Sequence, residues 1–169
     1  MGPEPAGAVA EEIVLRPIGW VRGGRAEPFD DGWDAETCAI ELDGSRFGPD
    51  VVAGLDGFSH VEVVYLFDRV DEADVVTGAR RPRGREDWPV VGIFAQRGRV
   101  RPNRLGVTIC RLLEVDGLSV RVRGLDAIDG SPVLDLKPHL AGFAARGEVR
   151  EPTWATEIMA GYWAPPPAD

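Results

Sequence analysis

The sequence predicts an all-β, mainly antiparallel fold with a short C-terminal helix. Short runs of Val, Ile, Leu, Phe and Tyr recur along the chain, and Gly, Pro and Asp separate them. Only one segment, near the C-terminus, has helical spacing of its apolar residues. At 169 residues the chain is long enough for one hydrophobic core and too short for two comfortable ones. We therefore expect a single small β-barrel or β-sandwich.

Seven segments have the composition of strands. The first contains Pro17, which suggests an edge strand. The third ends in a continuous apolar run, as a largely buried strand would. Asp116 and Gly117 between two later segments predict a hairpin, because they can supply the positive φ of a primed turn. The expected strands are residues 13–22, 37–43, 60–67, 90–96, 106–117, 118–126 and 131–138.

Residues 151–163 predict the helix. Pro152 suits its first turn, and four apolar residues at helical spacing form one face: Trp154, Ile158, Met159 and Tyr162. The two ends of the chain, rich in Pro, Ala and Gly, predict flexible tails. The expected organisation is a tail at 1–12, one domain at 13–163 and a tail at 164–169.

The charge of the chain is segregated. A formal charge of −9 and a pI near 4.8 argue against indiscriminate binding of polyanions. Residues 80–104 nevertheless hold eight arginines and two acids, so this window carries +6 and the other residues carry −15. Arginine forks suit carboxylate and phosphate groups, although a solvated arginine-rich turn explains the spacing equally well.

Several functional classes are disfavoured by the motifs that the sequence lacks. It contains no glycine-rich nucleotide fingerprint after a strand, no Walker loop, no GxSxG elbow and no HExxH. Cys38 and Cys110 lie in apolar runs without CxxC spacing, which predicts buried thiols and no metal site. The chain begins without a signal-peptide pattern and has no run of membrane-spanning length, so we expect a cytoplasmic protein.

One row of polar residues has the pattern of a catalytic group. Asp135, Lys137 and His139 alternate, so an extended strand would place them on one face, where they could position a nucleophile or accept a proton. Lys137 is the only lysine of the chain, although a solvated surface residue is the simpler interpretation. His60, at the start of a strand, is more often a structural histidine than a catalytic one.

Three stretches read together resemble the TrmO-like family of tRNA threonylcarbamoyladenosine N6-methyltransferases. They are "GLDGFSHVEVVYLF", "VGIFAQRGRVRPNRLGVTICRLL" and "RGLDAIDGSPVLDLKPHL". Their order and separation also match, from about residue 13 to residue 140. The resemblance implies a small antiparallel β-barrel that forms a homodimer and binds S-adenosylmethionine near the subunit interface.

The resemblance also implies roles for particular residues. It places the cofactor against Gly32, Trp33, Asp68, Arg69, Arg97, Val107, Gly124, Leu125 and Asp126. The chemistry of the reaction adds a further expectation: the acceptor nitrogen must lose a proton, which Asp135 or His139 could receive, with Lys137 tuning the neighbouring carboxylate. The residues left to meet the substrate are Arg99, Arg101, Asn103 and Arg104, with the arginine strip guiding RNA phosphates.

The chain departs from the family pattern where substrate would be bound. Arg97 lies in Ala-Gln-Arg-Gly where relatives have Ala-Thr-Arg-Ser, Arg104 replaces a proline, and His139 replaces a tyrosine. The leading hypothesis is methylation of N6 of threonylcarbamoyladenosine beside the tRNA anticodon. The alternatives are a methyltransferase for a small molecule and a sensor that binds S-adenosylmethionine without catalysis.

Overall fold

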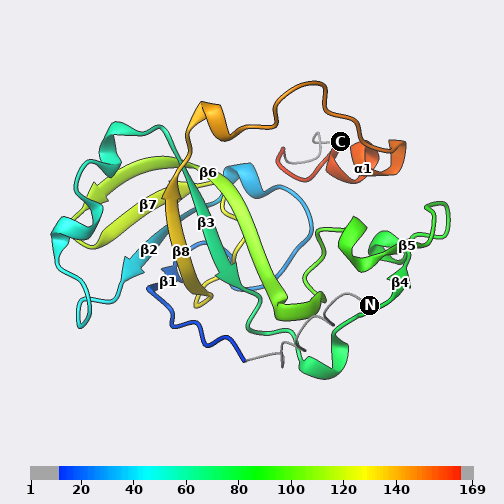
Figure 1. Cartoon of the computed structure of the whole chain (residues 1–169), viewed down its shortest axis with the longest axis horizontal. Coiled ribbons are helices and arrows are strands. Elements are labelled where there is room, and N and C mark those ends of the chain that lie inside the picture. The colour runs from blue at the N-terminus through cyan, green and yellow to red at the C-terminus, as the bar shows by residue number, and fades with distance from the viewer. Residues whose placement is uncertain (1–11, 165–169) are drawn as a thin grey trace, which may run out of the picture.

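The protein folds into a closed antiparallel β-barrel, shown in Figure 1 as a computed structural model that describes residues 12–164. The order of strands around the barrel is β1-β2-β7-β6-β3-β8, and pairing of β8 with β1 closes it. The barrel and the C-terminal helix confirm the predicted fold class. The strands are β1 (Gly19–Arg22), β2 (Thr37–Leu42), β3 (His60–Leu66), β6 (Leu105–Asp116), β7 (Ser119–Arg123) and β8 (Pro132–Pro138).

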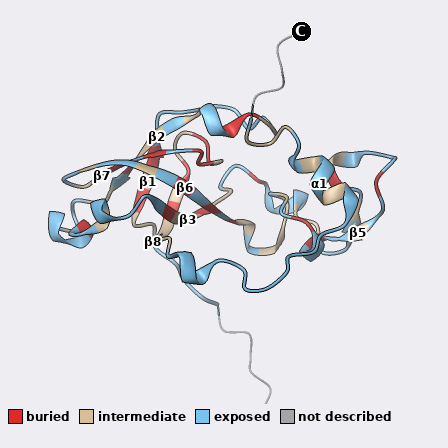
Figure 2. Ribbon diagram, turned by 90° about the horizontal axis from the view of Figure 1, so that it is seen from above, coloured by how far each residue is buried: buried red, intermediate tan, exposed pale blue. Residues whose placement is uncertain are grey.

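The core fills the barrel because each strand alternates between inward apolar and outward side chains. In β3, Val61, Val63 and Tyr65 are buried, and Figure 2 shows that the buried residues gather within the strands. Tyr65 is the largest of the fully buried side chains. The other members of the core cluster are Val21, Ile40, Val52, Cys110, Val120, Val122, Leu125, Ala127 and Val133.

The expectation of an edge strand at Pro17 is wrong. The strand begins only at Gly19, and β1 pairs with β2 on one side and with β8 on the other. Pro17 precedes the strand, so its missing N–H costs the ladder nothing. The apolar residues before it, Ile13 to Leu15, are exposed and lie outside the barrel.

Two other expected elements differ in detail. Only Val91–Gly92 of residues 90–96 forms a strand (β5), which pairs with β4 (Ala79–Arg80) in a separate ribbon, and a single turn follows at Ile93–Ala95. The predicted hairpin joins β6 to β7, but its two loop residues are Gly117 and Leu118. The positive φ falls on Gly117 (56°) and not on Asp116, as a type II′ turn requires.

Three long connections leave the barrel at the same end. Because all neighbouring strands are antiparallel, residues 23–36, 67–104 and 124–131 all follow strands that run toward this end. The second connection contains the arginine-rich window. Helix α1 (Thr153–Met159), shorter than the expected 151–163, packs near this connection, where Trp88 Nε1 donates to Glu157 Oε2 at 2.6 Å. The expected tails lie outside the described residues, apart from residues 12 and 164.

Gly106 is required by close packing against Tyr65. A Cβ added to Gly106 would lie 2.7 Å from Tyr65 Cε2, inside a fully buried part of the barrel. We predict that Gly106→Ala lowers the free energy of unfolding by about 1–3 kcal/mol, the usual cost of overpacking a core. Urea denaturation measures this loss. Gly98→Ala is the control, because a Cβ there has no atom within 4 Å, and an equal loss in both variants would contradict the prediction.

Candidate functional site

The Asp126 carboxylate is the centre of a hydrogen-bonded cluster at the end of the barrel where the three long connections leave. Tyr65 from β3 donates its hydroxyl to Oδ1 at 2.9 Å, and Thr108 from β6 donates to the same oxygen. Tyr162, which follows α1, donates to Oδ2. Three segments distant in sequence therefore meet on one carboxylate in the connection between β7 and β8.

The sequence brings these hydroxyls together in two ways. Tyr65 and Thr108 occupy inward positions of paired strands, and both are buried. Tyr162 is held from outside, because residues 32–34 donate three backbone hydrogen bonds to residues 161–163. The lengths are 3.1 Å from Gly32 N to Gly161 O, 3.0 Å from Trp33 N to Tyr162 O, and 2.8 Å from Asp34 N to Trp163 O.

The tyrosines of the cluster remain neutral donors. Burial, and then the negative charge of Asp126, raise the pKa of Tyr65 and the pKa of Tyr162. A phenol with a raised pKa does not ionise near neutral pH, so neither tyrosine acts as a phenolate base. Their role is to hold the Asp126 carboxylate in one orientation.

The thiols of the barrel are unreactive, and both cysteines are free. Burial raises the pKa of Cys38 to about 12, with contributions from Glu36 and Asp129. Burial also raises the pKa of Cys110, which is 2% exposed. Because the thiolate is the nucleophilic form, neither cysteine supplies a nucleophile.

Five of the expected cofactor residues lie around this cluster. Arg97 Nη2 donates to the backbone oxygen of Val107 at 2.7 Å, and Val107 is the neighbour of Thr108. Gly124 has a φ of 81° and donates its N–H to Glu36 O at 3.0 Å, and Leu125 beside it is 1% exposed. The structure thus brings Arg97, Val107 and the segment ending at Asp126 to one end of the barrel.

The other expected cofactor residues fall into two groups. Gly32 and Trp33 fix the first connection: Gly32 O accepts a hydrogen bond from Arg25 Nη2 at 2.7 Å, and the Arg25 guanidinium lies 4.1 Å from the Trp33 ring centroid. Asp68 and Arg69 are exposed in the second connection, where Arg69 Nη1 donates to Ala26 O at 2.8 Å. No hydrogen bond within residues 12–164 joins Asp68 or Arg69 to the Asp126 cluster.

The expected catalytic row lies on the outer wall of the barrel. Asp135 and Lys137 share the outward face of β8 and bond to each other. Val64 lies between Asp135 and Val107 in register, so two strand spacings, about 10 Å, separate these residues. His139 follows the strand, and its N–H donates to His60 O at 3.0 Å.

Lys137 is a permanent cation in this arrangement. Its hydrogen bond to Asp135 raises the pKa of the ammonium, and the charge of Asp135 adds to the effect. A group whose pKa is raised above its ordinary value of 10.5 holds its proton at neutral pH. Lys137 therefore does not accept a proton, and the carboxylate of Asp135 and the imidazole of His139 are the remaining groups of the row that could.

The expected substrate residues lie in a fixed loop. Asn103 and Arg104 adopt left-handed backbone conformations, with φ of 63° and 51°. Arg101 Nη1 donates to Gln96 O and Arg104 Nη1 donates to Val70 O, both at 2.7 Å. Arg99 is exposed, with no side-chain hydrogen bond to another described residue.

Most of the arginine charge in residues 80–104 is not neutralised. Within the described part of the chain, carboxylates pair with only two of the eight arginines: Arg83 with Asp31 at 2.8 Å, and Arg85 with Asp87. Where the others bond, they bond to backbone oxygens, which carry no net charge. Those without a carboxylate partner are Arg80, Arg81, Arg97, Arg99, Arg101 and Arg104.

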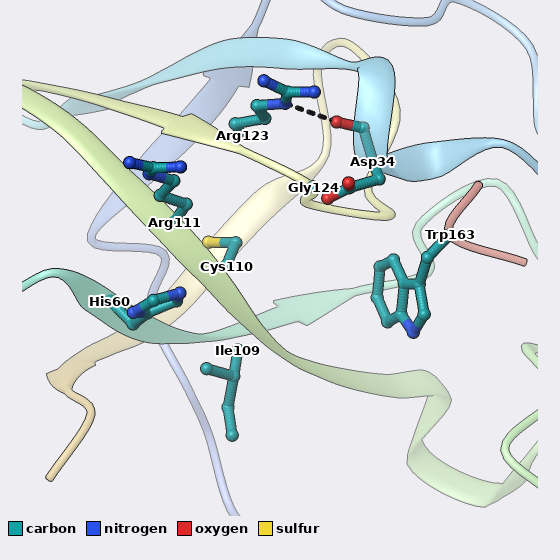
Figure 3. Close-up of a pocket in the computed structure, with 8 residues that line it drawn as sticks. All are labelled: Asp34, His60, Ile109, Cys110, Arg111, Arg123, Gly124 and Trp163. Carbon is teal, nitrogen blue, oxygen red and sulfur yellow. Dashed lines mark hydrogen bonds between the residues drawn. The ribbon is translucent and has the colours of Figure 1, made fainter. Parts of the chain in front are cut away.

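A pocket of about 250 Å³ opens where β7 ends alongside β6, and Gly124, two residues before Asp126, is part of its lining (Figure 3). Trp163 lines one side of it, and Gly124 and Asp34 connect it to the first and third connections. The full lining is Asp34, His60, Ile109, Cys110, Arg111, Arg123, Gly124 and Trp163.

Sequence reasoning missed several residues of the site. Tyr65 and Thr108 are hydroxyl-bearing residues inside apolar strands, and this pattern could have marked them as partners of a buried polar group. Tyr162 and Trp163 had no such signal, because only the hydrogen bonds to residues 32–34 place them there.

Among residues 12–164, no group of His, Cys, Asp and Glu is arranged to hold a metal ion. No helix in the same range has the length and apolarity to cross a membrane.

The structure defines the class of fold, a closed antiparallel β-barrel with a hydrogen-bonded carboxylate at one end, and the comparisons with known proteins define the family. Residues 27–145 match the family of the tRNA-methyltransferase O N-terminal domain. The chain therefore belongs to the TrmO family, which confirms the resemblance found in the sequence.

Individual relatives agree with this assignment. A probable S-adenosyl-L-methionine-binding protein of Pyrococcus abyssi is 34% identical over 142 residues, 82% of this chain and 74% of the relative. The tRNA (adenine(37)-N6)-methyltransferase of Escherichia coli is 36% identical over 54% of this chain and 40% of its own length. The crystal structure of TrmO from Pseudomonas aeruginosa superposes with a TM-score of 0.67 at 26% identity, covering 83% of this chain and 62% of that one. The chain thus spans less than two thirds of the Escherichia coli methyltransferase and of TrmO from Pseudomonas aeruginosa.

The bond from Tyr162 to Asp126 should stabilise the fold. We predict that Tyr162→Phe lowers the free energy of unfolding by about 1–2 kcal/mol, because a half-buried carboxylate loses one charge-assisted donor. Chemical denaturation measures the change. Ser119→Ala is the control, since it removes a hydroxyl donor from Glu41 at an exposed site, where water replaces it. Equal losses in the two variants would show that the hydrogen bond from Tyr162 to Asp126 contributes no more to the free energy of unfolding than an exposed one.

Proposed function

We propose that the protein transfers a methyl group from S-adenosylmethionine and binds this cofactor at the end of the barrel where the three long connections leave. The observation that carries the proposal is the convergence of Arg97, Val107 and the segment 124–126 on the Asp126 cluster. The relative from Pyrococcus abyssi is described as binding the same cofactor.

The residues present fit the chemistry of the cofactor. S-adenosylmethionine carries a carboxylate, an ammonium, ribose hydroxyls and an adenine ring. Arg97 offers a guanidinium to the carboxylate, and the Oδ2 atom of Asp126 accepts only one side-chain hydrogen bond from the described residues, which leaves acceptor capacity for a ligand donor. Val107 and Trp163 supply apolar surface.

We propose that the acceptor is N6 of threonylcarbamoyladenosine beside the tRNA anticodon. Two observations support an RNA substrate: the arginines of residues 80–104 that no carboxylate neutralises, and the tRNA methyltransferases among the relatives. These arginines lie on the connection that leaves the same end of the barrel as the Asp126 cluster. RNA phosphates bound there would hold the acceptor base at the cofactor.

The bound cofactor supplies a methyl group on a sulfonium, which needs no metal for its transfer. The task of the protein is then alignment and exclusion of water. The backbone oxygen of Val107 holds the Arg97 guanidinium, and the fixed Asp126 carboxylate sets the neighbouring wall. The acceptor nitrogen releases a proton, and we propose the Asp135 carboxylate or the His139 imidazole as its acceptor.

A homodimer and a cytoplasmic location complete the proposal. The outward face of β6 exposes Val107 and Ile109, 38% and 47% of their surfaces respectively, and a second subunit would cover such apolar side chains. tRNA methylation takes place where tRNA is found, which favours the cytoplasm.

Incubation with labelled cofactor tests the acceptor. The purified protein is given S-adenosylmethionine labelled in the methyl group, with tRNA and small-metabolite fractions in separate reactions. We expect label in tRNA that carries threonylcarbamoyladenosine, and none in tRNA without this modification. Label in the metabolite fraction alone would support a small-molecule methyltransferase. Cofactor binding without transfer to either fraction would support a sensor.

Replacement of Arg97 tests the cofactor site. We predict that Arg97→Ala weakens S-adenosylmethionine binding by about tenfold or more, the usual effect of losing a charge-assisted hydrogen bond. Titration calorimetry measures the affinity. Arg99→Ala is the matched control, because Arg99 lies two residues away, is exposed and bonds to no described residue. Unchanged affinity in Arg97→Ala would contradict this placement of the site.

A further inference from the structure

Two arginines face each other directly on the outer wall of the barrel. Arg111 of β6 and Arg123 of β7 are partners in the strand register, and both are exposed. His60 of β3 is the register partner of Arg111 on its other side, so three basic side chains form a row across three neighbouring strands. Like charges directly opposite one another destabilise a sheet, so this pair needs a physical reason.

The neighbouring position on β7 shows how the chain compensates a similar charge. Arg121 is also exposed and outward, and its Nη1 lies 2.6 Å from Glu114 Oε2 on β6. Arg111 has no ion pair and no side-chain hydrogen bond to any residue from 12 to 164. No carboxylate of the described residues pairs with Arg111 or Arg123, whereas Glu114 neutralises Arg121 on the same pair of strands.

Arg123 is oriented as a binding group would be. Its Nε donates to the backbone oxygen of Asp34 at 2.6 Å, which fixes the plane of the guanidinium. Its Nη1 and Nη2 atoms have no acceptor within the described chain. Figure 3 shows the side chains of Arg111 and Arg123 close to each other on the two strands.

Both arginines line the pocket of about 250 Å³, which also contains Gly124. This volume accommodates one end of a ligand, such as a carboxylate or a phosphate with its neighbouring atoms. Asp34 is the only acid in the lining, so the two guanidinium groups outweigh it. Trp163 bounds the pocket on the side away from His60, as the close-up shows.

We propose that the Arg111–Arg123 pair binds an oxyanion group of the methyl acceptor, in a pocket that adjoins the Asp126 cluster through Gly124. This inference rests on the proposed function. Threonylcarbamoyladenosine in RNA offers two such groups: the free carboxylate of its threonyl arm and the phosphates that flank the nucleoside. Planar guanidinium forks bind either group with paired hydrogen bonds.

Binding measurements with two ligands separate these sources. The nucleoside threonylcarbamoyladenosine carries the carboxylate and no phosphate, whereas an anticodon stem-loop RNA with unmodified adenine carries phosphates and no such carboxylate. We expect Arg111→Ala to weaken binding of one of them by about tenfold or more. Loss with the nucleoside identifies the carboxylate, and loss with the stem-loop alone identifies a phosphate. Arg111→Lys keeps the charge without the fork and should recover only part of the affinity.

The controls make the inference falsifiable. Arg121→Ala removes the same charge from an exposed outward position, where the lost ion pair with Glu114 contributes little to stability. Arg111→Ala removes a repulsion, so neither variant should unfold at a temperature well below that of the wild type. Equal losses of affinity in Arg111→Ala and Arg121→Ala overturn the site, as does wild-type affinity for both ligands in Arg111→Ala. A loss of S-adenosylmethionine affinity alone assigns the pair to the cofactor and overturns the acceptor site.

The two proposals fail in different ways. A wild-type protein that binds neither ligand and methylates no tRNA contradicts the proposed function and this inference together. A wild-type protein that methylates modified tRNA, with Arg111→Ala fully active and of unchanged affinity, contradicts only the assignment of the Arg111–Arg123 pair.

Discussion

The Asp126 carboxylate ties the barrel wall, a loop and the C-terminal segment into one site. It accepts hydrogen bonds from Tyr65 on β3, from Thr108 on β6 and from Tyr162 after α1. A half-buried carboxylate requires such partners, because an unpaired charge there would cost several kcal/mol, on the order of 3–5. The hydrogen bonds to Asp126 also fix where the third connection, residues 124–131, crosses the end of the barrel. The position of Gly124 and the opening of the pocket depend on that crossing.

Closure of the barrel has a second consequence for the site. A closed sheet has no edge to protect, and its ends carry the long connections. The three connections at one end carry Asp126 and the arginines of residues 80–104. The barrel wall is a rigid scaffold that positions the connections, and the connections carry many of the candidate site residues. This arrangement is common in proteins whose sites lie on loops.

The distribution of charge is explained only when hydrogen bonds are taken into account. The arginines of residues 80–104 bond mainly to backbone oxygens, which fixes the connection and leaves their charge in place. The pair on the barrel wall was not part of that window. The predicted hairpin makes the strands of Arg111 and Arg123 neighbours, but nothing in the linear sequence predicts the register shift between Leu112 and Glu114 that makes these two arginines partners.

The sequence by itself determined the fold class and the family, and it predicted a set of site residues. Short apolar runs separated by Gly, Pro and Asp predicted β2, β3, β6, β7 and β8, because apolar and β-branched residues favour the half-buried surface of a strand. Long motifs predicted that Arg97, Val107 and the segment 124–126 belong to one site, and these residues lie at the same end of the barrel. The tertiary structure alone decided the rest. Strand register made partners of Arg111 and Arg123, and barrel closure overruled the edge expected from Pro17. Backbone hydrogen bonds between residues 32–34 and residues 161–163 place Tyr162 within hydrogen-bond distance of Asp126. Each depends on contacts between distant segments, which local patterns of residues do not encode.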